Sequence, residues 1–594
     1  MPVPPLTRAI CSKAAASIVS TRPPDLHWIK LALIGSRTLD FLKSYLIVEA
    51  ARRGIGLEVW IGPYGQIEQQ ALDPQSELYQ FKADMVVILP DIEEIAPSQI
   101  WSYQSLATNI DELNQTQEHL VSRFQNVISS IRQNSSQKIL IGNLLPPFWN
   151  PTGSLDPMME SSFASFLQGL NDSIAACCRA TPDAAVLNLS SVLTQIGMNQ
   201  WRDERMAWLA RAPLSSMAMS AISELAARQI RNWYVPQKKC LVLDMDNTLW
   251  GGVLGELGVE GIQLGADYPG SVFVDFQRRI LALRARGVLL AAASKNNAAD
   301  VEQVLAEHPA CVLKRHHFSA FEVHWEDKAT SMRRIAKTLN IGLDALVFFD
   351  DNAVEREWVR TQLPEVSVIE VSASPLEYGR CLEQSEFFDC FSLTEEDQKR
   401  AELYQQESGR TQLLAQSASL DDFIRSLEMT VTIGLFDEAT LPRIVQLLGK
   451  TNQFNLTTQR HEAARLRQML EAGGIGIWAR VQDRFGDAGL VAAALVVKES
   501  EKWMIDSFLM SCRVIGRGVE TALLAAIERL VHEHGGRELT GRFLPTSKNQ
   551  PAADFFEKHG YSRLSADNSL WHLCLDELRP LPETFTTTGI SFQS

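Results

Sequence analysis

The chain has 594 residues, of which 45% are hydrophobic and 21% charged, a globular composition in a chain too long for one hydrophobic core. Its formal net charge is −15, and no basic block interleaved with aromatic residues occurs, so nucleic acid is a poor candidate partner. No run of about 18 apolar residues occurs, and the nine cysteines are scattered without Cys-x-x-Cys spacing. We therefore expect a cytoplasmic protein with no membrane span and no disulfide framework.

The first part of the chain, residues 1–235, alternates between apolar strands and helical segments. This alternation predicts an α/β domain with a parallel sheet covered by helices on both faces. The predicted strands cover residues 31–36, 57–62, 84–90, 138–145 and 184–192.

Two polar residues follow predicted strands of this first domain. Ser36 stands where SGNH hydrolases of the Gly-Asp-Ser-Leu type place their serine, and Asn143 follows a later strand. However, the Asp of that motif is absent, and no Asp-x-x-His follows near the end of the domain. We therefore expect an SGNH-like scaffold with an incomplete triad and a docking or structural role.

A second β/α alternation covers residues 236–395. The predicted strands are residues 240–244, 288–294, 346–350 and 366–371, and the predicted helices are residues 272–286, 298–307 and 328–339. Parallel sheets of this kind build their sites at the C-terminal edge. Three of the predicted strands end in a polar residue: Asp244, Ser294 and Asp350.

The pattern Asp244-x-Asp246-x-Thr248 directly follows the first of these strands. A carboxylate can attack a phosphoryl group, and a second carboxylate can protonate the leaving group and then activate water. The pattern is the first signature of haloacid-dehalogenase (HAD) phosphatases. Taken alone, Asp244 and Asp246 could instead be a helix N-cap and a turn, which is the less favoured explanation.

The remaining HAD signatures follow in the order that the family shows. Ser294 ends an apolar strand, where it suits a phosphate oxygen, and Lys328 opens a helix, where it can neutralise the charge around Asp244. The carboxylate pair Asp350-Asp351 suits Mg²⁺, which prefers oxygen ligands. Alone, each could be a cap, a solvated residue or a turn; their common order favours the catalytic interpretation. The intervals between them are filled by predicted helices and strands, so we expect a capless HAD-like domain.

The third region, residues 396–580, begins with a predicted long helix at Thr394 and continues with strands and helices of an α+β domain. The loop Arg513-Val-Ile-Gly516-Arg-Gly518 lies between a strand and a helix, and such loops present backbone N–H groups to a pyrophosphate. Together with a downstream pattern that starts at Asn549, it resembles N-acetyltransferases (GNAT fold). Residues 581–594 read as a polar tail.

Cys512 directly precedes this loop, near a helix N-terminus that lowers the pKa of a thiol. A thiolate there could carry an acyl group as a thioester. A buried packing cysteine is an equally good explanation on composition alone. Cys240 is a poorer candidate, because it lies at the opposite end of the strand that leads to Asp244.

The whole combination resembles the FkbH-like proteins of polyketide assembly lines. The resemblance rests on runs spread over most of the chain: Gly62-Pro-Tyr64, LDMDNTLWGGVLGE, SKNN, DKA, FFDDN, NQFNLTT and SCRVIGRGVE. It implies an Mg²⁺-dependent phosphatase and glyceryl transferase. Such an enzyme takes a glyceryl group from 1,3-bisphosphoglycerate, releases phosphate and loads the glyceryl group onto the thiol of a phosphopantetheinylated acyl carrier protein.

The resemblance also implies roles for individual residues. Asp244 would be the nucleophile or a metal ligand, Asp246 the acid/base, and Cys512 the relay thiol. The phosphate-binding residues would be Thr248, Ser294, Lys295 and Lys328. The metal ligands would be Asp244, Asp246, Asp350 and Asp351, and the acyl- or pantetheine-binding residues Arg513, Gly516, Gly518 and Asn549.

One position departs from the family pattern, in which a cysteine often precedes the Ser-Lys-Asn run; here that position is Ala293. If that cysteine were the relay, this chain would lack it. Two other functions remain open on the sequence. One is a small-molecule phosphatase with an added acyl-CoA transferase, and the other is a non-catalytic scaffold for carrier proteins.

Overall fold

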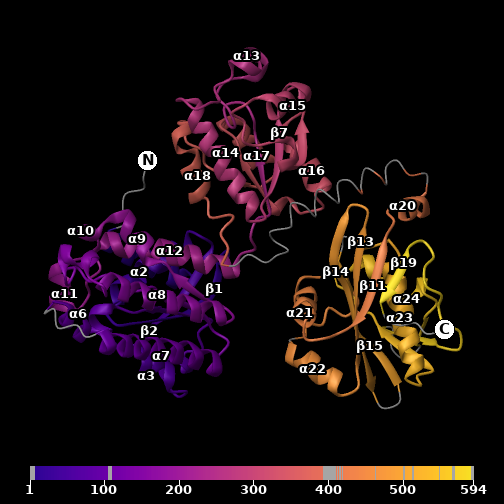
Figure 1. Ribbon diagram of the computed structural model, residues 1–594, viewed down its shortest axis with the longest axis horizontal. Coiled ribbons are helices and arrows are strands. Elements are labelled where there is room, and N and C mark those ends of the chain that lie inside the picture. Colours follow the sequence, from indigo (N-terminus) through magenta and orange to yellow (C-terminus); the bar gives the residue numbers. More distant parts are fainter. Residues whose placement is uncertain are drawn as a thin grey trace. The chain divides into compact units, whose positions relative to one another are not determined.

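The computed structural model (Figure 1) describes much of the chain between residues 7 and 589. The described residues are 7–104, 110–391, 410, 413, 417, 419–451, 453–461, 463–499, 502–511, 514–546, 549–564 and 569–589. They divide into two compact units, Met1–Lys238 with Leu382–Leu393, and Lys239–Cys381 with Thr394–Ser594. The described residues form three β-sheets. None of the described helices is long and apolar enough to cross a membrane.

The first sheet is parallel and has the strand order β2-β1-β3-β4-β5. Its strands are β1 (His27–Gly35), β2 (Ile55–Ile61), β3 (Met85–Leu89), β4 (Lys138–Gly142) and β5 (Ala184–Leu187). The helices are α1 (Arg8–Thr21), α2 (Asp40–Ala51), α3 (Ile67–Leu72), α4 (Glu77–Gln80), α5 (Ile92–Ile95), α6 (Pro97–Gln104), α7 (Ile110–Asn134), α8 (Phe163–Ala180), α9 (Leu189–Ile196), α10 (Met198–Trp201), α11 (Glu204–Ala210) and α12 (Ser216–Tyr234), with the 3₁₀ turn η1 at Gly153–Met158.

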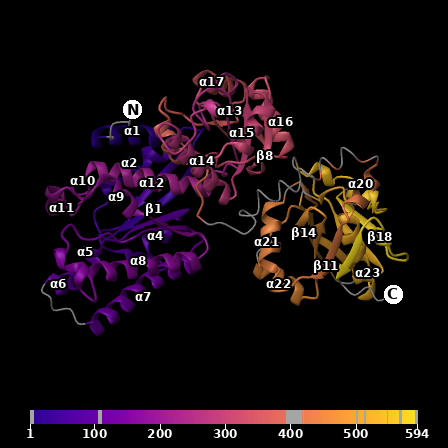
Figure 2. The ribbon, with the colours of Figure 1, turned by 45° about the horizontal axis from the view of Figure 1, so that its top comes forward.

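Alternate side chains of β1 enter two hydrophobic clusters, because successive residues of a strand point to opposite faces. Leu31 and Leu33 pack with α1, α2, α9 and α12, whereas Ala32 and Ile34 pack with α7 and α8. Figure 2 shows the two sets of helices on opposite sides of the sheet. The predicted parallel sheet with helices on both faces is therefore confirmed.

One predicted strand of this sheet ends earlier than expected. The prediction extended it over residues 184–192, but β5 stops at Leu187 and α9 begins at Leu189. Asn188 is the reason, because its side chain accepts a hydrogen bond from Ser191 N at 3.3 Å and caps the helix. The same unit also includes the segment after residue 381, where Glu386 pairs with Arg53 at 2.6 Å.

The second sheet is also parallel, with the order β10-β9-β6-β7-β8. Its strands are β6 (Cys240–Leu243), β7 (Leu289–Ser294), β8 (Phe318–Val323), β9 (Leu346–Phe349) and β10 (Ser367–Val368). The helices are α13 (Leu254–Gly261), α14 (Gly270–Ala285), α15 (Ala298–Glu307), α16 (Lys328–Thr338), α17 (Ala353–Gln362) and α18 (Tyr378–Gln384). β6 is fully buried in the middle of the sheet, so the chain leaves it at the centre of the C-terminal edge. The sequence did not predict β8, in which Ser319 and Glu322 interrupt the apolar pattern.

The third sheet is mixed, with the order β17-β18-β16-β15-β14-β13-β11-β19, and β12 pairs with β15. The strands are β11 (Thr430–Leu435), β12 (Phe454–Asn455), β13 (Ile475–Asp483), β14 (Gly486–Glu499), β15 (Lys502–Met510), β16 (Glu538–Arg542), β17 (Ser562–Arg563), β18 (Leu570–Cys574) and β19 (Thr586–Gly589). The helices are α20 (Leu420–Ser426), α21 (Leu441–Lys450), α22 (Ala463–Glu471), α23 (Val519–Glu533) and α24 (Phe555–Lys558).

The expectation of a free tail over residues 581–594 is wrong for residues 586–589. These residues form β19, which pairs in parallel with β11. The run Thr586–Thr588 is β-branched, which favours an added edge strand. The long helix expected from Thr394 falls largely outside the described residues.

Candidate active site

Three carboxylates meet at the C-terminal edge of the second sheet. Asp244 follows β6, and Asp350 and Asp351 follow its neighbour β9. Leu243 pairs with Phe349, so the residues after these two positions leave the sheet side by side. One carboxylate oxygen from each of the three residues lies within 4.8 Å of the other two. The structure thus brings Asp244 together with a carboxylate pair that lies more than a hundred positions later in the sequence.

Lys328 connects this group from the first turn of α16. Its side chain is 3% exposed, and its Nζ donates to an oxygen of Asp244 and to the carbonyl oxygen of Ala293, the latter at 2.5 Å. Nζ also lies 3.3 Å from Asp350 Oδ2. Burial alone would lower the pKa of Lys328, but the two carboxylates outweigh it and raise the pKa above its ordinary value. The lysine is therefore a fixed cation beside Asp244.

The charges of this group do not balance. When ionised, three carboxylates and one ammonium leave an excess of two negative charges, which suits a divalent cation. Burial, followed by the nearby Asp244, raises the pKa of Asp350 to about 7. Asp350 Oδ2 is buried and accepts no hydrogen bond from the described residues. An oxygen-only donor set with an unused buried acceptor fits Mg²⁺, the cofactor predicted from the sequence.

Asp246 lies close to this group but serves another purpose. Its Oδ1 accepts from Trp250 Nε1 at 2.9 Å and from Leu254 N at 3.1 Å, and its Oδ2 accepts from Asn296 Nδ2 at 2.9 Å. Its carboxylate is absent from the group of three, so the prediction that its side chain ligates the metal is not supported. Because burial raises the pKa of Asp246, the geometry favours a positioned acid.

The predicted phosphate-binding residues lie around this edge in different environments. Ser294 is buried at the end of β7, as expected for a residue that faces a bound phosphate. Thr248 is fully buried, and its Oγ1 lies 3.3 Å from both the backbone N and a carboxylate oxygen of Asp351. Lys295 is 40% exposed and donates to Glu355 at 2.5 Å, so that carboxylate already neutralises its charge.

The comparisons with known proteins agree with this geometry. The family model described as "FkbH, N-terminal domain" matches residues 30–230. A crystal structure of the N-terminal part of the protein BF1531 from Bacteroides fragilis, "containing phosphatase domain complexed with Mg", is 30% identical. Its alignment covers 65% of this chain and 100% of that chain, with a TM-score of 0.56.

The chain belongs to the FkbH family. It is therefore an enzyme, as the sequence predicted.

Other solved structures match a smaller part of the chain. A GNAT-family acetyltransferase from Desulfovibrio desulfuricans is 15% identical, with 24% of this chain and 99% of that chain covered and a TM-score of 0.20. A GNAT-family acetyltransferase from Staphylococcus aureus is 10% identical, with 25% and 99% covered and a TM-score of 0.21. The comparison with curated proteins gave no match.

Sequence reasoning missed two residues of this FkbH active site. Arg356, on α17, is buried and donates to the carbonyl oxygens of Asp350 and Asp351, both at 2.8 Å, and so fixes the loop that carries the carboxylates. Asn296 holds Asp246. Asn296 lies in the SKNN run and could have been found there, whereas a lone arginine on a helix gives no signal.

The predicted acyl-binding residues of the third region are only partly described. Cys512 and Arg513 lie outside the described residues. Gly516 and Gly518 have φ angles of 76° and 81°, values that favour glycine, and Gly518 is the N-cap of α23. Asn549 is fully buried; its Nδ2 donates to the carbonyl oxygens of Asn455 and Leu544, both at 2.9 Å, and its Oδ1 accepts from Thr546 N at 2.7 Å. Its amide therefore serves the chain's own backbone.

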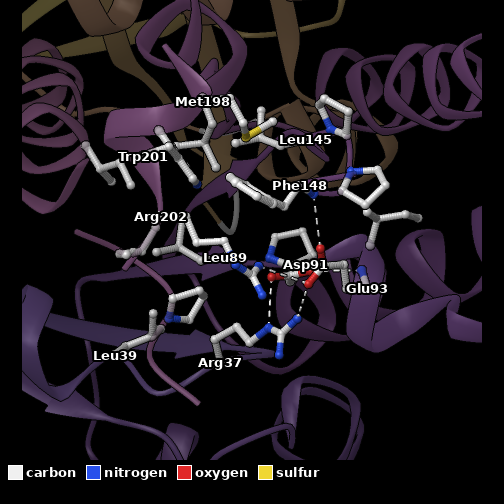
Figure 3. Close-up of a pocket in the computed structure, with 18 residues that line it drawn as sticks. Arg37, Leu39, Leu89, Asp91, Glu93, Leu145, Phe148, Met198, Trp201 and Arg202 are labelled. Atoms are coloured by element: carbon white, nitrogen blue, oxygen red, sulfur yellow. Dashed lines mark hydrogen bonds and ion pairs between the residues drawn. The ribbon is translucent and has the colours of Figure 1, made fainter. Parts of the chain in front are cut away.

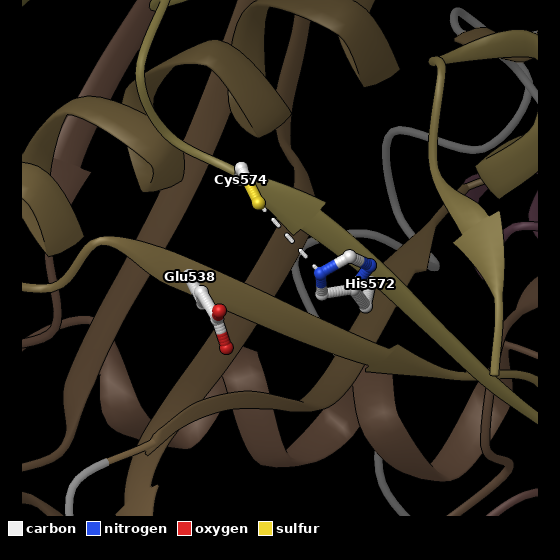
Figure 4. A group of neighbouring side chains, drawn as sticks. All are labelled: Glu538, His572 and Cys574. Atoms are coloured by element: carbon white, nitrogen blue, oxygen red, sulfur yellow. Dashed lines mark hydrogen bonds between the residues drawn. The ribbon is translucent and has the colours of Figure 1, made fainter.

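A second group of potential metal ligands lies on the third sheet. Glu538 of β16 is paired with Cys574 of β18, and His572 lies two residues before Cys574 (Figure 4). Cys574 Sγ is 3.7 Å from His572 Nε2. Glu538 and Cys574 are exposed, whereas none of the three carboxylates of the second sheet is exposed and Asp350 is buried.

The candidate hydrolase residues of the first sheet are tied to the backbone. Ser36 is buried, and its Oγ accepts a hydrogen bond from Asp91 N at 3.2 Å. Asn143 Oδ1 accepts from Leu189 N at 2.6 Å, and its Nδ2 donates to Ser190 Oγ at 2.6 Å. These contacts agree with the structural role expected from the incomplete triad.

Proposed function

We propose that this FkbH enzyme takes the glyceryl group of 1,3-bisphosphoglycerate, releases phosphate and loads the glyceryl group onto the thiol of a phosphopantetheinylated acyl carrier protein. The observation that carries the proposal is the buried group of Asp244, Asp350, Asp351 and Lys328, whose excess negative charge suits Mg²⁺ and, through it, a phosphate. Membership of the FkbH family and the BF1531 phosphatase domain support the same chemistry.

The balance of atoms separates two steps. The substrate carries one phosphate as an acyl phosphate and one as a monoester, whereas the glyceryl thioester carries none. A thiol can displace the acyl phosphate directly: the C–O bond to phosphate breaks, a C–S bond forms, and the thiol proton leaves with the phosphate. The monoester is less reactive and needs hydrolysis. We assign that hydrolysis to the edge of the second sheet.

The residues at this edge divide the hydrolysis between them. Asp244 attacks the phosphorus, and Asp246 donates a proton to the departing glyceryl oxygen. Water then attacks the aspartyl phosphate and gives its proton back to Asp246. Lys328 holds the orientation of Asp244, and Arg356 holds the loop of Asp350 and Asp351. Mg²⁺ would be held by Asp244, Asp350 and Asp351 and would neutralise phosphate oxygens.

We also propose a role and an architecture for each part of the chain. Residues 1–235 would be an SGNH-like domain without hydrolase activity, residues 236–395 a capless HAD-like domain, and residues 396–580 a GNAT-like domain. The parallel pairing of β15 with β16 within an otherwise antiparallel run supports the last assignment. Cys512 would be the relay thiol.

One feature of the third sheet disfavours the alternative of an acyl-CoA transferase. β15 pairs with β14 along one edge, and its other edge pairs with β16 only over Trp503–Ile505. Beyond that point β12 takes over the edge at Leu509 and Met510, and Leu456 N donates to Phe508 O at 3.1 Å. A coenzyme A chain that adds to the sheet as a strand along β15 would need this edge to be free.

Incubation of the chain with 1,3-bisphosphoglycerate, Mg²⁺ and a phosphopantetheinylated carrier protein tests the proposal, with intact mass and released phosphate as readouts. A glyceryl adduct with both phosphates released supports it. A phosphoglyceryl adduct would show that the chain does not hydrolyse the phosphate monoester. Free phosphate without an adduct would favour a small-molecule phosphatase. If neither an adduct nor free phosphate forms, the result would favour a non-catalytic scaffold.

The relay thiol is tested separately. Cys512→Ala should abolish loading and leave phosphate monoester release intact. Cys574→Ala, an exposed cysteine in the same region, is the matched control and should load normally. Loading by Cys512→Ala would show that Cys512 is not the relay.

A further inference from the structure

One cavity of the first unit lies at the C-terminal edge of the first sheet, with about 730 Å³ of empty space when its open mouth is included (Figure 3). It opens beyond β1 and β3, whose following residues Arg37, Leu39 and Pro90–Glu93 line it. The strand order changes direction between β1 and β3, and ligands of doubly wound sheets bind at such a switch point.

The walls of this cavity are apolar. They consist of side chains from the loop after β4, from α10 and from the segment before α12, including Leu145, Phe148, Met198, Trp201 and Leu214. Figure 3 shows Leu145, Met198 and Trp201 on the side opposite Arg37. Such walls favour an aliphatic ligand.

The floor is charged but internally paired. Arg37 pairs with Asp91 at 2.9 Å, with Glu93 at 2.8 Å and with Glu94 at 2.5 Å. Arg202 lies 3.2 Å from Glu93, and its guanidinium lies over the Phe148 ring at 5.6 Å. A charged ligand group would have to compete with these pairs or lie against a charge of its own sign. The three carboxylates outnumber the two guanidinium groups by one, so the floor disfavours an anionic ligand, and a cationic ligand would have to displace a paired arginine. A neutral ligand avoids both costs.

The paired groups still offer hydrogen bonds of both kinds. An ionised carboxylate has about four acceptor sites. Those of Asp91 accept from Arg37 and from Glu93 N, which leaves sites unused. A guanidinium has five N–H donors. Among the described residues, the hydrogen bond that Arg202 donates is the one to Glu93. An amide, which both donates and accepts, matches this floor.

We propose that this cavity binds a neutral aliphatic chain that carries an amide. The pantetheine arm of a carrier protein has this chemistry, and so does a free aliphatic amide. The choice of the pantetheine arm as the ligand rests on the proposed function, whereas the proposal that the cavity binds a neutral amide does not.

Titration of the full chain, without metal or bisphosphoglycerate, tests the proposal by calorimetry. The probes are S-methylpantetheine and N-hexylacetamide, with hexanoate and hexylammonium as charged counterparts of similar size. Saturable binding is expected for at least one neutral amide, with the charged probes at least tenfold weaker. Tighter binding of S-methylpantetheine identifies the arm as the source, and tighter binding of N-hexylacetamide identifies a free amide. Equal binding of a charged probe, or no saturable amide binding, would overturn the proposal.

Two cavity-filling variants locate the binding. Met198→Trp and Leu145→Trp fill the cavity from neighbouring walls and should weaken amide binding at least tenfold. Their matched controls, Met158→Trp and Leu155→Trp, change exposed residues of η1 and should leave binding unchanged. Each filled variant is first shown to unfold at the temperature of its control. Unchanged binding in both filled variants would place the amide elsewhere.

The test separates this inference from the proposed function. Asp244→Asn should end release of the monoester phosphate and keep amide binding, because the two sites belong to different sheets. If the unmodified chain does not bind the amide, the cavity proposal is rejected, and the proposed chemistry at Asp244 is unaffected.

Discussion

Two five-stranded parallel sheets of this chain end in clusters of charged side chains, and the two clusters are built differently. At the second sheet, three carboxylates share one lysine, Lys328, and carry excess negative charge. At the first sheet, Arg37 alone pairs with Asp91, Glu93 and Glu94, and Arg202 supplies a second cation. The architecture of the edge is the same in both sheets, while the charge balance differs.

This difference teaches where to look for the chemistry. A fold offers an edge, but the residues on it decide what the edge does. The unbalanced group needs a divalent cation and attracts a phosphate through it. The group at the first sheet, in which each carboxylate is paired with an arginine, holds its own shape and is suited to a neutral ligand. The predictions below are ordered by expected effect and test whether the two edges differ as described.

The largest effect is expected from Asp244→Asn. Loss of the nucleophile should lower release of the monoester phosphate by roughly a thousandfold or more. Asp91→Asn makes the same chemical change at the first sheet and should release phosphate at the unmodified rate. Phosphate release is measured with 1,3-bisphosphoglycerate and Mg²⁺. Equal losses in the two variants would remove the distinction between the edges.

The next effect concerns stability. Lys328→Met leaves buried carboxylates without their cation and should lower the free energy of unfolding by about 3–5 kcal/mol. Lys295→Met removes a neighbouring, exposed lysine and should cost about 0–1 kcal/mol. Hydrogen exchange of the β6 amides reports on the stability of this sheet. Similar protection in both variants would show that Lys328 is not essential to the charge group.

Metal binding should stabilise the second sheet alone. Mg²⁺ at a hundredfold excess over its dissociation constant should add about 2.7 kcal/mol to the stability of the unit that binds it. Asp351→Asn should reduce this gain, and Asp91→Asn should not. Hydrogen exchange with and without Mg²⁺ distinguishes the sheets. A gain in protection that centres on β1 and β3 would place the cation at the wrong edge.

The sequence predicted where the polar residues of the second sheet lie, because the signals for their positions are local. An apolar strand that is followed by a polar residue, such as Asp244, Ser294 or Asp350, predicts that this residue lies at the C-terminal edge of the sheet. The supporting contacts are not local: Arg356 acts on backbone carbonyls, which no residue pattern records. The hydrogen bond that Asn296 donates to Asp246 likewise forms only when the neighbouring strand β7 is in place.

The fold shows the same limit. Long apolar strands and periodic helices were predicted close to their observed bounds, such as α15 and α16. The edge strands β8, β10 and β19 were missed or misjudged, because a strand paired along one edge needs less apolar sequence. The cavity of the first sheet was invisible for a related reason, since its lining comes from many separate segments.

The smallest effect is expected from Ser36→Ala. The hydroxyl accepts a hydrogen bond from Asp91 N, so its removal should cost about 1 kcal/mol of stability. Phosphate release should not change, and hydrolysis of p-nitrophenyl acetate should remain at the level of the unmodified chain. Ser20→Ala, on the exposed end of α1, is the control for a serine without this contact. A specific loss of ester hydrolysis in Ser36→Ala would mean that the first edge is also catalytic. The paired arginines and carboxylates there would then support a nucleophile. The two sheets would in that case differ in the reaction that each performs.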